Sequence, residues 1–582
     1  MAKIFAKLDK FTGLHCSSDG RTELEDGEAP IMNNFKITPG YKLRTRDGYT
    51  VLSRFDGGIR GMISRDAPPF FAAAAGDTVY VSDEGFESME SVGTVAGEGD
   101  VSFFEFGGEL YLLDGEKIRR VSSSGLSAVE PYVPTVMIST LPSGTGTLFE
   151  SPNALTRKVR QRFTPDGESP SFVLCSPASS VEKVEINGEE VPAEGYSFDG
   201  ETGSVVFSSP PAASFPDAVT VTFTRSGGAP CGAERCRFAV SYGGGNDTRA
   251  FFWGDPENPA CRYFCGVVGG KGDLSYFPEE NYTVVGDGEP INVIMRHYDR
   301  MLIFTKRKAY YSLAEQKTDA AGRAYTSFPV YTLSDTAGSD LCAPGVMADN
   351  FPYTLSGGKL CRWTSTNVRD ERNALCVSDR INEELSSLAS SRARLMHRRS
   401  GRELFISAGE GTVFVYSYAL DVFYRYTGLD MTHMTEKDGK TFFALSDGSI
   451  CAAGGKNDGG KAIKAEWYSK YFDFGKPEKE KNVLRLDLSV FPDVSTYSEI
   501  SWATDRSSHT GREGGSALFV GYELADFSKL SFDALSFDTS YAAKNLSLRT
   551  RVRRFGFIRI ALTNEKKDSS FHLVSLSMTG TY

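Results

Sequence analysis

Two closely spaced pairs of cysteines are the best metal-ligand candidates in the sequence. Cys231 and Cys236 are separated by four residues, and Cys261 and Cys265 by three. Four thiolates can hold a structural zinc ion, but such sites usually contain tighter knuckles that repeat. The sequence between the pairs, FAVSYGGGNDTRAFFWG at 238–254, is aromatic and typical of strands. Buried thiols are therefore our main interpretation, and a zinc site is the alternative.

Residues for acid–base or nucleophilic catalysis do not form a known pattern. The six histidines are far apart and form no i, i+4 or H-x-H pair. The sequence contains no G-x-S-x-G elbow, Walker A loop or Rossmann fingerprint, and no S-x-D-x-G-x-T-W box typical of sialidase propellers. Paired carboxylates can cleave glycosides, but Asp438-Gly439 and Asp447-Gly448 are better explained as hairpin turns. We expect no enzymatic activity, no cofactor and no metal.

Two clusters of arginines could bind phosphate groups or an acidic protein surface. In the second cluster arginine occupies alternate positions from 549 to 553, which favours one exposed face of a strand. Contact with another subunit, or simple solvent exposure, is the main interpretation, and contact with DNA is the alternative. The clusters comprise Arg392, Arg394, Arg398, Arg399 and Arg402, and then Arg549, Arg551, Arg553, Arg554 and Arg559.

The elements that would position these residues are recurring hairpins. Clear copies are ELYLLDGEKIRRV (109–121), PYTLSGGKLCRWT (352–364) and KTFFALSDGSICAAG (440–454). Looser copies are DTVYVSDEGFESM (77–89), RMLIFTKRKAYYSL (300–313) and RELFISAGEGTVFVYSY (402–418). From residue 302 onward their starts are roughly 40–50 residues apart, which is the chain length that one four-stranded propeller blade needs. A hairpin alone cannot bury its apolar face, so copies must pack on one another. The repeat predicts a β-propeller.

Composition agrees with an all-β protein of several domains. The chain has 582 residues, of which 12% are aromatic, and 59 glycines. One short helix is predicted, over Ile381–Leu395, from apolar residues at helical spacing. The net charge of −11 argues against a dedicated nucleic-acid binder, although DNA could slide past such a surface. No apolar run approaches the roughly 20 residues of a membrane span, and no signal peptide is visible, so synthesis in a cytoplasm is expected.

Breaks in the repeat indicate where other domains lie. The expected organisation is an extended N-terminal arm (1–50), a first set of blades (51–130), an inserted β-sandwich (131–226), a second set of blades (227–460) and a C-terminal β-sandwich (461–582). The segment GGKNDGG (454–460) is interpreted as a linker. The strands of the arm lack an evident core of their own, so the arm is expected to form an interface.

Several short segments, taken in their order along the chain, resemble one protein family. The resemblance extends over almost the whole chain. The segments are Asp26-Gly27-Glu28-Ala29, Met32-Asn33-Asn34-Phe35, Gly40-Tyr41, Arg46-Asp47-Gly48-Tyr49, Tyr276-Phe277-Pro278-Glu279-Glu280-Asn281-Tyr282, Tyr298-Asp299 before the strand Met301–Phe304, Ile381-Asn382, and Trp467 with Asp473-Phe474-Gly475, Pro477 and Lys481.

The family resembled is the tail hub or nozzle group of tailed bacteriophages, which includes tail tubular protein B and packaged-DNA stabilisation proteins. The resemblance implies a structural virion protein of the tail, made in the bacterial host, with a β-propeller assembled into a six-fold ring. Its partners would be the portal and adaptor, tail fibre or tail-tip proteins, and double-stranded DNA passing through the channel without sequence recognition. The alternative is a carbohydrate-binding or glycan-cleaving propeller, such as a virion receptor-binding protein.

Overall fold

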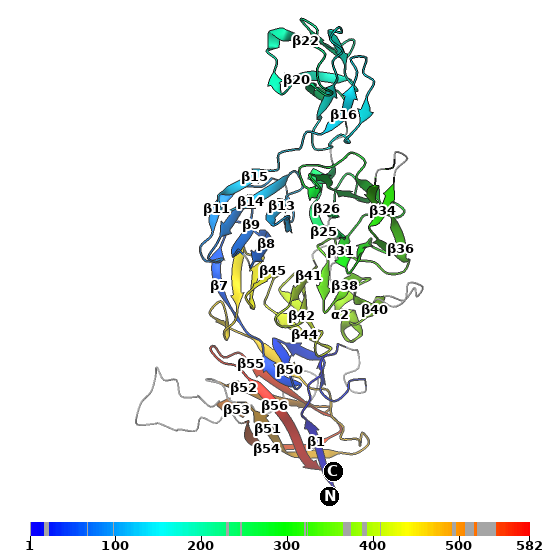
Figure 1. Cartoon of the computed structure of the whole chain (residues 1–582). Helices are drawn as coiled ribbons and strands as arrows, with labels where there is room; N and C mark the ends of the chain where they lie inside the picture. The colour runs from blue at the N-terminus through cyan, green and yellow to red at the C-terminus, as the bar shows by residue number, and fades with distance from the viewer. Residues whose placement is uncertain are drawn as a thin grey trace. The chain divides into compact units, whose positions relative to one another are not determined.

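The regular secondary structure of the computed structural model is almost entirely β-strand (Figure 1). It describes residues 2–16, 23–66, 68–96, 98–228, 232–244, 247–318, 322, 324–364, 374–386, 393–407, 409–491, 496–506, 517–520 and 543–582. The chain forms two compact units. Unit 1 comprises residues 1–91, 337–341 and 345–582, and unit 2 comprises 92–336 and 342–344. Within the described ranges, no helix has the length and apolarity that a membrane crossing would need.

Among the described residues, seven four-stranded groups recur, five as separate sheets and two within larger sheets. The first five are β8 (Ile59–Arg65), β9 (Phe70–Ala75), β10 (Thr78–Ser82) and β11 (Glu90–Thr94); β12 (Ser102–Phe106), β13 (Glu109–Leu113), β14 (Ile118–Ser122) and β15 (Gly125–Ala128); β25 (Phe238–Gly244), β26 (Asp247–Trp253), β27 (Cys261–Phe264) and β30 (Tyr282–Val284); β31 (Val293–His297), β32 (Arg300–Phe304), β33 (Ala309–Ser312) and β36 (Val330–Ser334); and β37 (Val346–Ala348), β38 (Phe351–Ser356), β39 (Lys359–Trp363) and β40 (Ala374–Cys376). The other two are β41 (Arg394–Arg398), β42 (Glu403–Ser407), β43 (Thr412–Ser417) and β44 (Val422–Thr427); and β45 (Met431–Lys437), β46 (Lys440–Leu445), β47 (Ser449–Ala453) and β7 (Tyr49–Arg54).

The hairpin turns within these groups have the backbone geometry that their sequences predict. Asp438 and Gly439 join β45 to β46, with φ values of 51° and 73°. Gly448 follows β46 with φ at 82°, and a Cβ there would lie 2.5 Å from the backbone oxygen of Phe55. Only glycine fits such a position, because both the dihedral and the close approach exclude a side chain. The interpretation of both Asp-Gly pairs as hairpin turns is confirmed.

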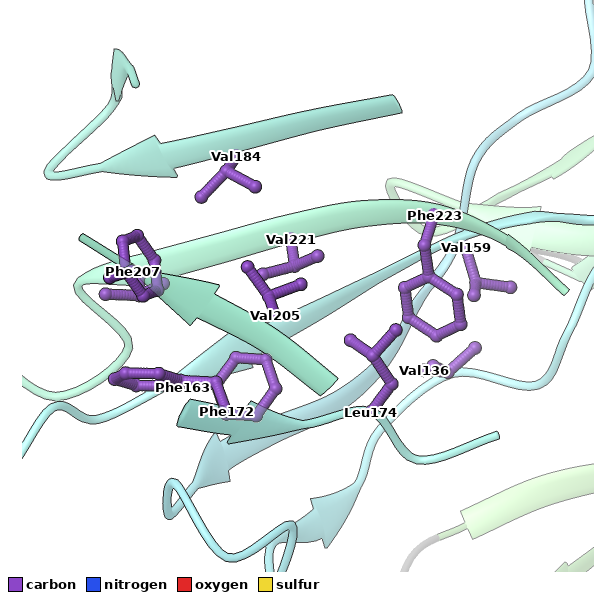
Figure 2. Packing of buried hydrophobic residues seen from close by; sticks show 11 residues of the cluster. Val136, Val159, Phe163, Phe172, Leu174, Val184, Val205, Phe207, Val221 and Phe223 are labelled. Carbon is purple, nitrogen blue, oxygen red and sulfur yellow. The ribbon is translucent and has the colours of Figure 1, made fainter. Parts of the chain in front are cut away.

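The segment from residue 131 to 226 forms two sheets that pair only among their own strands in unit 2. One contains β16 (Thr135–Thr140), β17 (Thr147–Leu148), β18 (Lys158–Phe163), β20 (Ala178–Ile186), β21 (Glu189–Glu190) and β24 (Val219–Arg225), and the other contains β19 (Ser171–Val173), β22 (Tyr196–Asp199) and β23 (Ser204–Phe207). A short 3₁₀ helix, Ala193–Gly195, precedes β22. Figure 2 shows Phe163, Phe172 and Phe207 packed with valines from both sheets. The buried cluster has eleven residues, each at most 6% exposed, which is the burial expected where two sheets face each other. They are Val136, Val159, Phe163, Phe172, Leu174, Val184, Val205, Phe207, Val219, Val221 and Phe223.

The first 50 residues do not form a separate arm, which corrects that prediction. β1 (Lys3–Leu8) pairs along β56 (His572–Thr581) at the C-terminal end, as the blue and red strands of Figure 1 show. β5 (Phe35–Thr38) and β6 (Lys42–Thr45) extend the same sheet, which continues through β51 (Lys481–Val490) to β54 (Lys544–Phe555). The C-terminal part of unit 1 is therefore completed by N-terminal strands.

A nine-stranded sheet joins the last strands to β41–β44. β4 (Ile31–Asn33) lies between β44 and β50 (Ala465–Tyr468), and the sheet continues through β55 (Ile558–Asn564) and β52 (Tyr497–Thr504) to β53 (Ala517–Val520). Trp467 of β50 is fully buried and packs edge-on against Phe11, with ring centroids 5.6 Å apart. Residues 461–582 thus share their core and their backbone pairing with the first 50 residues.

Two further expectations are wrong in detail. Of the predicted helix over Ile381–Leu395, the described residues form the end of a 3₁₀ turn, Asp379–Ile381, and α2 (Asn382–Ser386), whereas Leu395 lies on strand β41; residues 387–392 lie outside the described residues. The segment 454–460 is not a free linker, because β48 (Asn457–Asp458) pairs with both β7 and β49 (Lys461–Ala462). In both places partners distant in sequence decide the local structure.

Candidate interaction surface

The described members of the first arginine cluster contact other residues of their own unit. Arg398 forms an ion pair with Glu403 at 3.2 Å. Arg402 lies 3.5 Å from Asp349, and its guanidinium lies over the Tyr418 ring, 5.5 Å from the ring centroid. Since two guanidinium groups already have partners, this cluster offers little unpaired charge.

The remaining members of that cluster are more scattered. Arg394 is half-buried on β41 and donates a hydrogen bond to the backbone oxygen of Ala393 at 3.4 Å. Arg399 is exposed in the turn after β41, where its backbone N–H donates to Glu436 at 2.5 Å. Arg392 lies outside the described residues. The sequence cluster therefore does not become one basic patch.

Four of the five arginines of the second cluster lie on β54, the last strand in its sheet order. The fifth, Arg559, is half-buried on β55, with its guanidinium over the rings of Tyr468 and Tyr471 at 5.1 and 5.2 Å from their centroids. Arg549, Arg553 and Arg554 are exposed, and the backbone of Arg551 continues the strand between them. Thr550 is buried and donates its hydroxyl to the backbone oxygen of Val483 at 3.1 Å. The alternation of exposed arginine and buried threonine agrees with the prediction of one solvent-facing side.

Cross-strand register places these arginines on a wider face, which we call the basic sheet face. Phe5 of β1 pairs with Thr579 of β56, Thr579 with Arg485 of β51, and Arg485 with Arg549. Side chains at paired positions point to the same side of a sheet. Phe5 is 64% exposed and reaches solvent from a regular strand.

The basic sheet face has few acidic groups to balance it. Arg485 contacts Asp487 at 2.9 Å, and Lys7 contacts Asp9 at 3.0 Å. Within the described part of the chain, neither Arg549 nor Arg553 has an acidic partner. An exposed aromatic ring and unpaired guanidinium groups on the same face of a sheet are a composition found in protein contact surfaces, and they also suit phosphate binding. Sequence reasoning found the arginines but missed Phe5, because its β1–β56 pairing has no local signal.

The cysteine pairs do not form a metal site in the residues described. Cys231 lies outside them. The thiol of Cys236 donates to the backbone oxygen of Gly232 at 3.4 Å, and the sulfur of Cys265 accepts a hydrogen bond from the N–H of Ala250 at 3.2 Å. Burial raises the pKa of Cys265 to about 11, so its thiol stays protonated at neutral pH. These contacts are typical of buried structural thiols.

Two of the residues that carry the family resemblance, Asn34 and Arg46, belong to a buried polar junction inside unit 1. The guanidinium of Arg46 binds Asp458 through two hydrogen bonds, at 2.8 and 2.5 Å, and its Nε donates to the amide oxygen of Asn34 at 2.8 Å. Asn34 has φ at 57° and donates to Thr427 and to the backbone oxygen of Lys464, both at 2.8 Å. We call this set the Arg46 junction.

A second network next to the Arg46 junction uses the preceding asparagine. Asn33 accepts a hydrogen bond from Arg425 at 2.7 Å and donates to Glu466 at 3.2 Å. Arg425 in turn contacts Glu384 at 2.6 Å. Sequence reasoning singled out Asn33, Asn34 and Arg46 but not their partners, which come from segments hundreds of residues away. Their role in this structure is to join strands rather than to bind a ligand.

A buried carboxylate in unit 2 should make stability depend on pH. Asp255 accepts hydrogen bonds from Arg235 at 2.9 and 3.0 Å and from the hydroxyl of Tyr263 at 3.0 Å. Burial alone would raise the pKa of Asp255, but the hydrogen bonds from Arg235, Asn258, the Glu257 N–H and Tyr263 outweigh it and lower the pKa below 3.8. The ionised group thus stabilises the fold above pH 3.8, and this contribution is lost as pH falls through the lower folded-state pKa.

The variant Asp255→Asn is therefore expected to be less stable than the wild type at pH 7, and the difference should shrink toward pH 3. Urea denaturation at both pH values measures this. Asp287→Asn is the matched control, since Asp287 is exposed and pairs only with Lys308 on the surface. If Asp255→Asn lowered the free energy of unfolding equally at both pH values, the stabilisation would not come from the ionised carboxylate.

Comparisons with known proteins add no identification. No family model matches the sequence, and no curated protein matches it. A solved structure described as "Crystal Structure of Mitotic Checkpoint Complex" is 8% identical, with 70% of this chain and 93% of that chain covered, at a TM-score of 0.32. PorZ, an essential bacterial surface component of the type-IX secretion system of Porphyromonas gingivalis, is 10% identical, with 72% of this chain and 42% of PorZ covered, also at 0.32. Similarity at this level carries no functional argument.

Proposed function

We propose that this chain is a structural protein of a bacteriophage tail, a hub or nozzle subunit whose rings form part of the DNA conduit. In this proposal the seven four-stranded groups are blades of a β-propeller. The observation that carries it is the pairing of β7, near the N-terminus, with β47 of the last four-stranded group. A strand from the start of the chain that completes the final blade is the arrangement that closes a ring of blades.

Two further observations support this role. Three residues of the family resemblance, Asn33, Asn34 and Arg46, take part in two adjacent polar networks that join strands of unit 1. Pairing of both chain ends within one sheet leaves few free strand edges, and this makes for a stiff subunit suited to a conduit. The negative net charge would keep DNA from binding tightly to the wall of such a channel.

The basic sheet face is the proposed contact between neighbouring subunits. A closed ring needs two different, complementary patches on each subunit, and a chain with net charge −11 offers acidic surface as the complement. Negative-stain imaging of the purified full chain at high concentration should show six-fold rings with a bore about as wide as duplex DNA. Monomers at all concentrations, in the presence and absence of a portal–adaptor complex, would contradict the proposal.

Charge reversal tests the contact directly. The double variant Arg549→Glu/Arg553→Glu should raise the subunit concentration needed for ring formation by at least about ten-fold, because like charges would face each other at the contact. Mass photometry across a dilution series measures this. Lys566→Glu/Lys567→Glu is the control, since it makes the same change of charge at exposed loop positions away from β54. Rings that form normally but retain DNA less strongly would instead assign these arginines to DNA.

A further inference from the structure

Unit 2 contains an open cleft that the proposed conduit role does not use. Its volume is about 890 Å³, within the range of small-molecule sites. It lies beside strands β26, β27 and β30 and is bounded by the hairpin of β34 (Glu315–Thr318) and β35 (Ala324–Ser327). This hairpin is an addition between β33 and β36, outside the four-stranded pattern.

Both exposed and buried aromatic side chains line this cleft. Tyr282 and Tyr325 are 53% and 50% exposed among its lining residues. Deeper in, Phe264 is stacked on Phe251 and packs edge-on against Phe328, with both centroid distances at 5.2 Å. The packing fixes the plane of Phe264, while the two tyrosine rings remain available. Exposed aromatic rings around a fixed one offer flat apolar surface to a ligand.

The polar groups of the cleft are mostly neutral. Asn281 and Gln316 contribute amides, and Gln316 is oriented by a hydrogen bond that it donates to the Thr326 hydroxyl at 2.9 Å. The amide of Asn281 donates to the backbone oxygen of Cys265 at 3.4 Å. Thr283 and Ser327 add hydroxyl groups. Amides and hydroxyls both donate and accept hydrogen bonds, so they suit a ligand with many hydroxyl groups.

The two opposite charges deep in the lining neutralise each other. Arg249 contacts Asp247 at 2.5 Å and also donates to the backbone oxygen of Cys265 at 3.0 Å. Asp247 additionally accepts a hydrogen bond from Thr326. Glu280, at the rim, accepts a hydrogen bond from Ser151. A nucleic-acid strand would require a positively charged groove beside its stacking rings, and this cleft has no unpaired cation among its lining residues.

We propose that this cleft binds a neutral oligosaccharide. A sugar ring has apolar C–H faces, which pack on aromatic rings, and a rim of hydroxyl groups, which exchange hydrogen bonds with amides. Tyr282 and Tyr325 would contact the C–H faces, and Asn281 and Gln316 the hydroxyl rim. Binding here does not depend on ring formation, so a virion subunit could hold a cell-surface glycan while serving as part of a conduit.

Glycan binding by the purified full chain tests this inference. The probes are pentasaccharides of β-1,4-glucose, α-1,4-glucose, α-1,6-mannose and β-1,4-N-acetylglucosamine, titrated by saturation-transfer NMR and calorimetry. At least one should bind with a Kd of about millimolar or tighter, and its affinity should be insensitive to salt because no charge is involved. Failure of all four to bind would overturn the proposal, and so would preferential binding of a ten-residue oligothymidylate.

Variants locate the binding in the cleft. Tyr282→Ala and Tyr325→Ala should each weaken binding by about ten-fold or more, while Tyr282→Phe should retain most of it because the ring is kept. Tyr298→Ala is the matched control, since Tyr298 is 64% exposed in unit 2 but does not line the cleft. Unchanged melting temperatures would show that the variants are folded. Equal loss in Tyr298→Ala, or no loss in either cleft variant, would overturn the proposal.

Discussion

Replacing Arg46 with methionine is expected to lower the free energy of unfolding of unit 1 by about 3–5 kcal/mol, the cost of breaking a buried ion pair from one side. The Arg46 side chain is 2% exposed and its partner Asp458 is 14% exposed. Methionine fills a similar volume but leaves the Asp458 carboxylate without its two guanidinium hydrogen bonds. It also removes the donor to Asn34, whose amide oxygen is then paired only with the Thr427 N–H.

The loss of stability in Arg46→Met should arise because its ion pair is buried, and not because one positive charge is removed. Arg44 lies two residues earlier on β6, is 39% exposed, and contacts Asp47 at only 3.5 Å. Arg44→Met is therefore the matched control and should change stability by less than about 1 kcal/mol. Urea unfolding of both variants, followed by tryptophan fluorescence because Trp467 is buried in the same unit, measures the difference. Similar values for the two variants would show that the Arg46 junction is not a main source of stability.

Removing both partners isolates the interaction between them. In the double variant Arg46→Met/Asp458→Asn no buried charge is left alone, so the combined loss should be smaller than the sum of the single losses by about 1–3 kcal/mol. If the losses simply add, Arg46 and Asp458 stabilise the unit independently. The junction links residue 46 to residue 458, so its coupling energy also reports how strongly the chain's start is attached to its later strands.

Local sequence patterns predicted the hairpins of this protein better than they predicted which distant strands pair with one another. The Asp-Gly pairs at 438–439 and 447–448 specify tight turns by backbone geometry alone, and the structure contains both turns. The pairing of β1 with β56 has no such local signal, because the outer strand needs only alternating residues and could suit many sheets. The predicted N-terminal arm was wrong for this reason: a short strand without a core of its own can be buried by strands from the other end of the chain.

The same limit applies to the candidate sites. Alternation of arginines from 549 to 553 predicted an exposed strand face, since a two-residue period is local information. Phe5 joins that face only through the register of three successive strand pairs. In the first cluster, Glu403 and Asp349 neutralise arginines that the sequence presents as a basic run. Tertiary partners, rather than residue type, decide which charges remain available.

Phe172→Ala should destabilise the inserted segment by about 3–5 kcal/mol, which is the usual cost of deleting a buried phenylalanine ring. Phe172 is fully buried between the two sheets of this segment and packs edge-on against Phe163 at 5.4 Å and Phe207 at 5.2 Å (Figure 2). Alanine would leave a cavity between two rings that β18 and β23 hold in place. Because the strands of residues 131–226 pair only with one another, the damage should remain local.

The matched control is Phe215→Ala in the same segment, where the phenylalanine is 77% exposed and its loss should change stability by no more than about 0.5 kcal/mol. Limited proteolysis with mass spectrometry separates the outcomes: Phe172→Ala should be cleaved within 131–226 at low denaturant while fragments from unit 1 stay intact. A single transition that unfolds the whole chain at once would contradict this, because it would mean that the insertion and the surrounding strands unfold as one cooperative block despite their separate sheets.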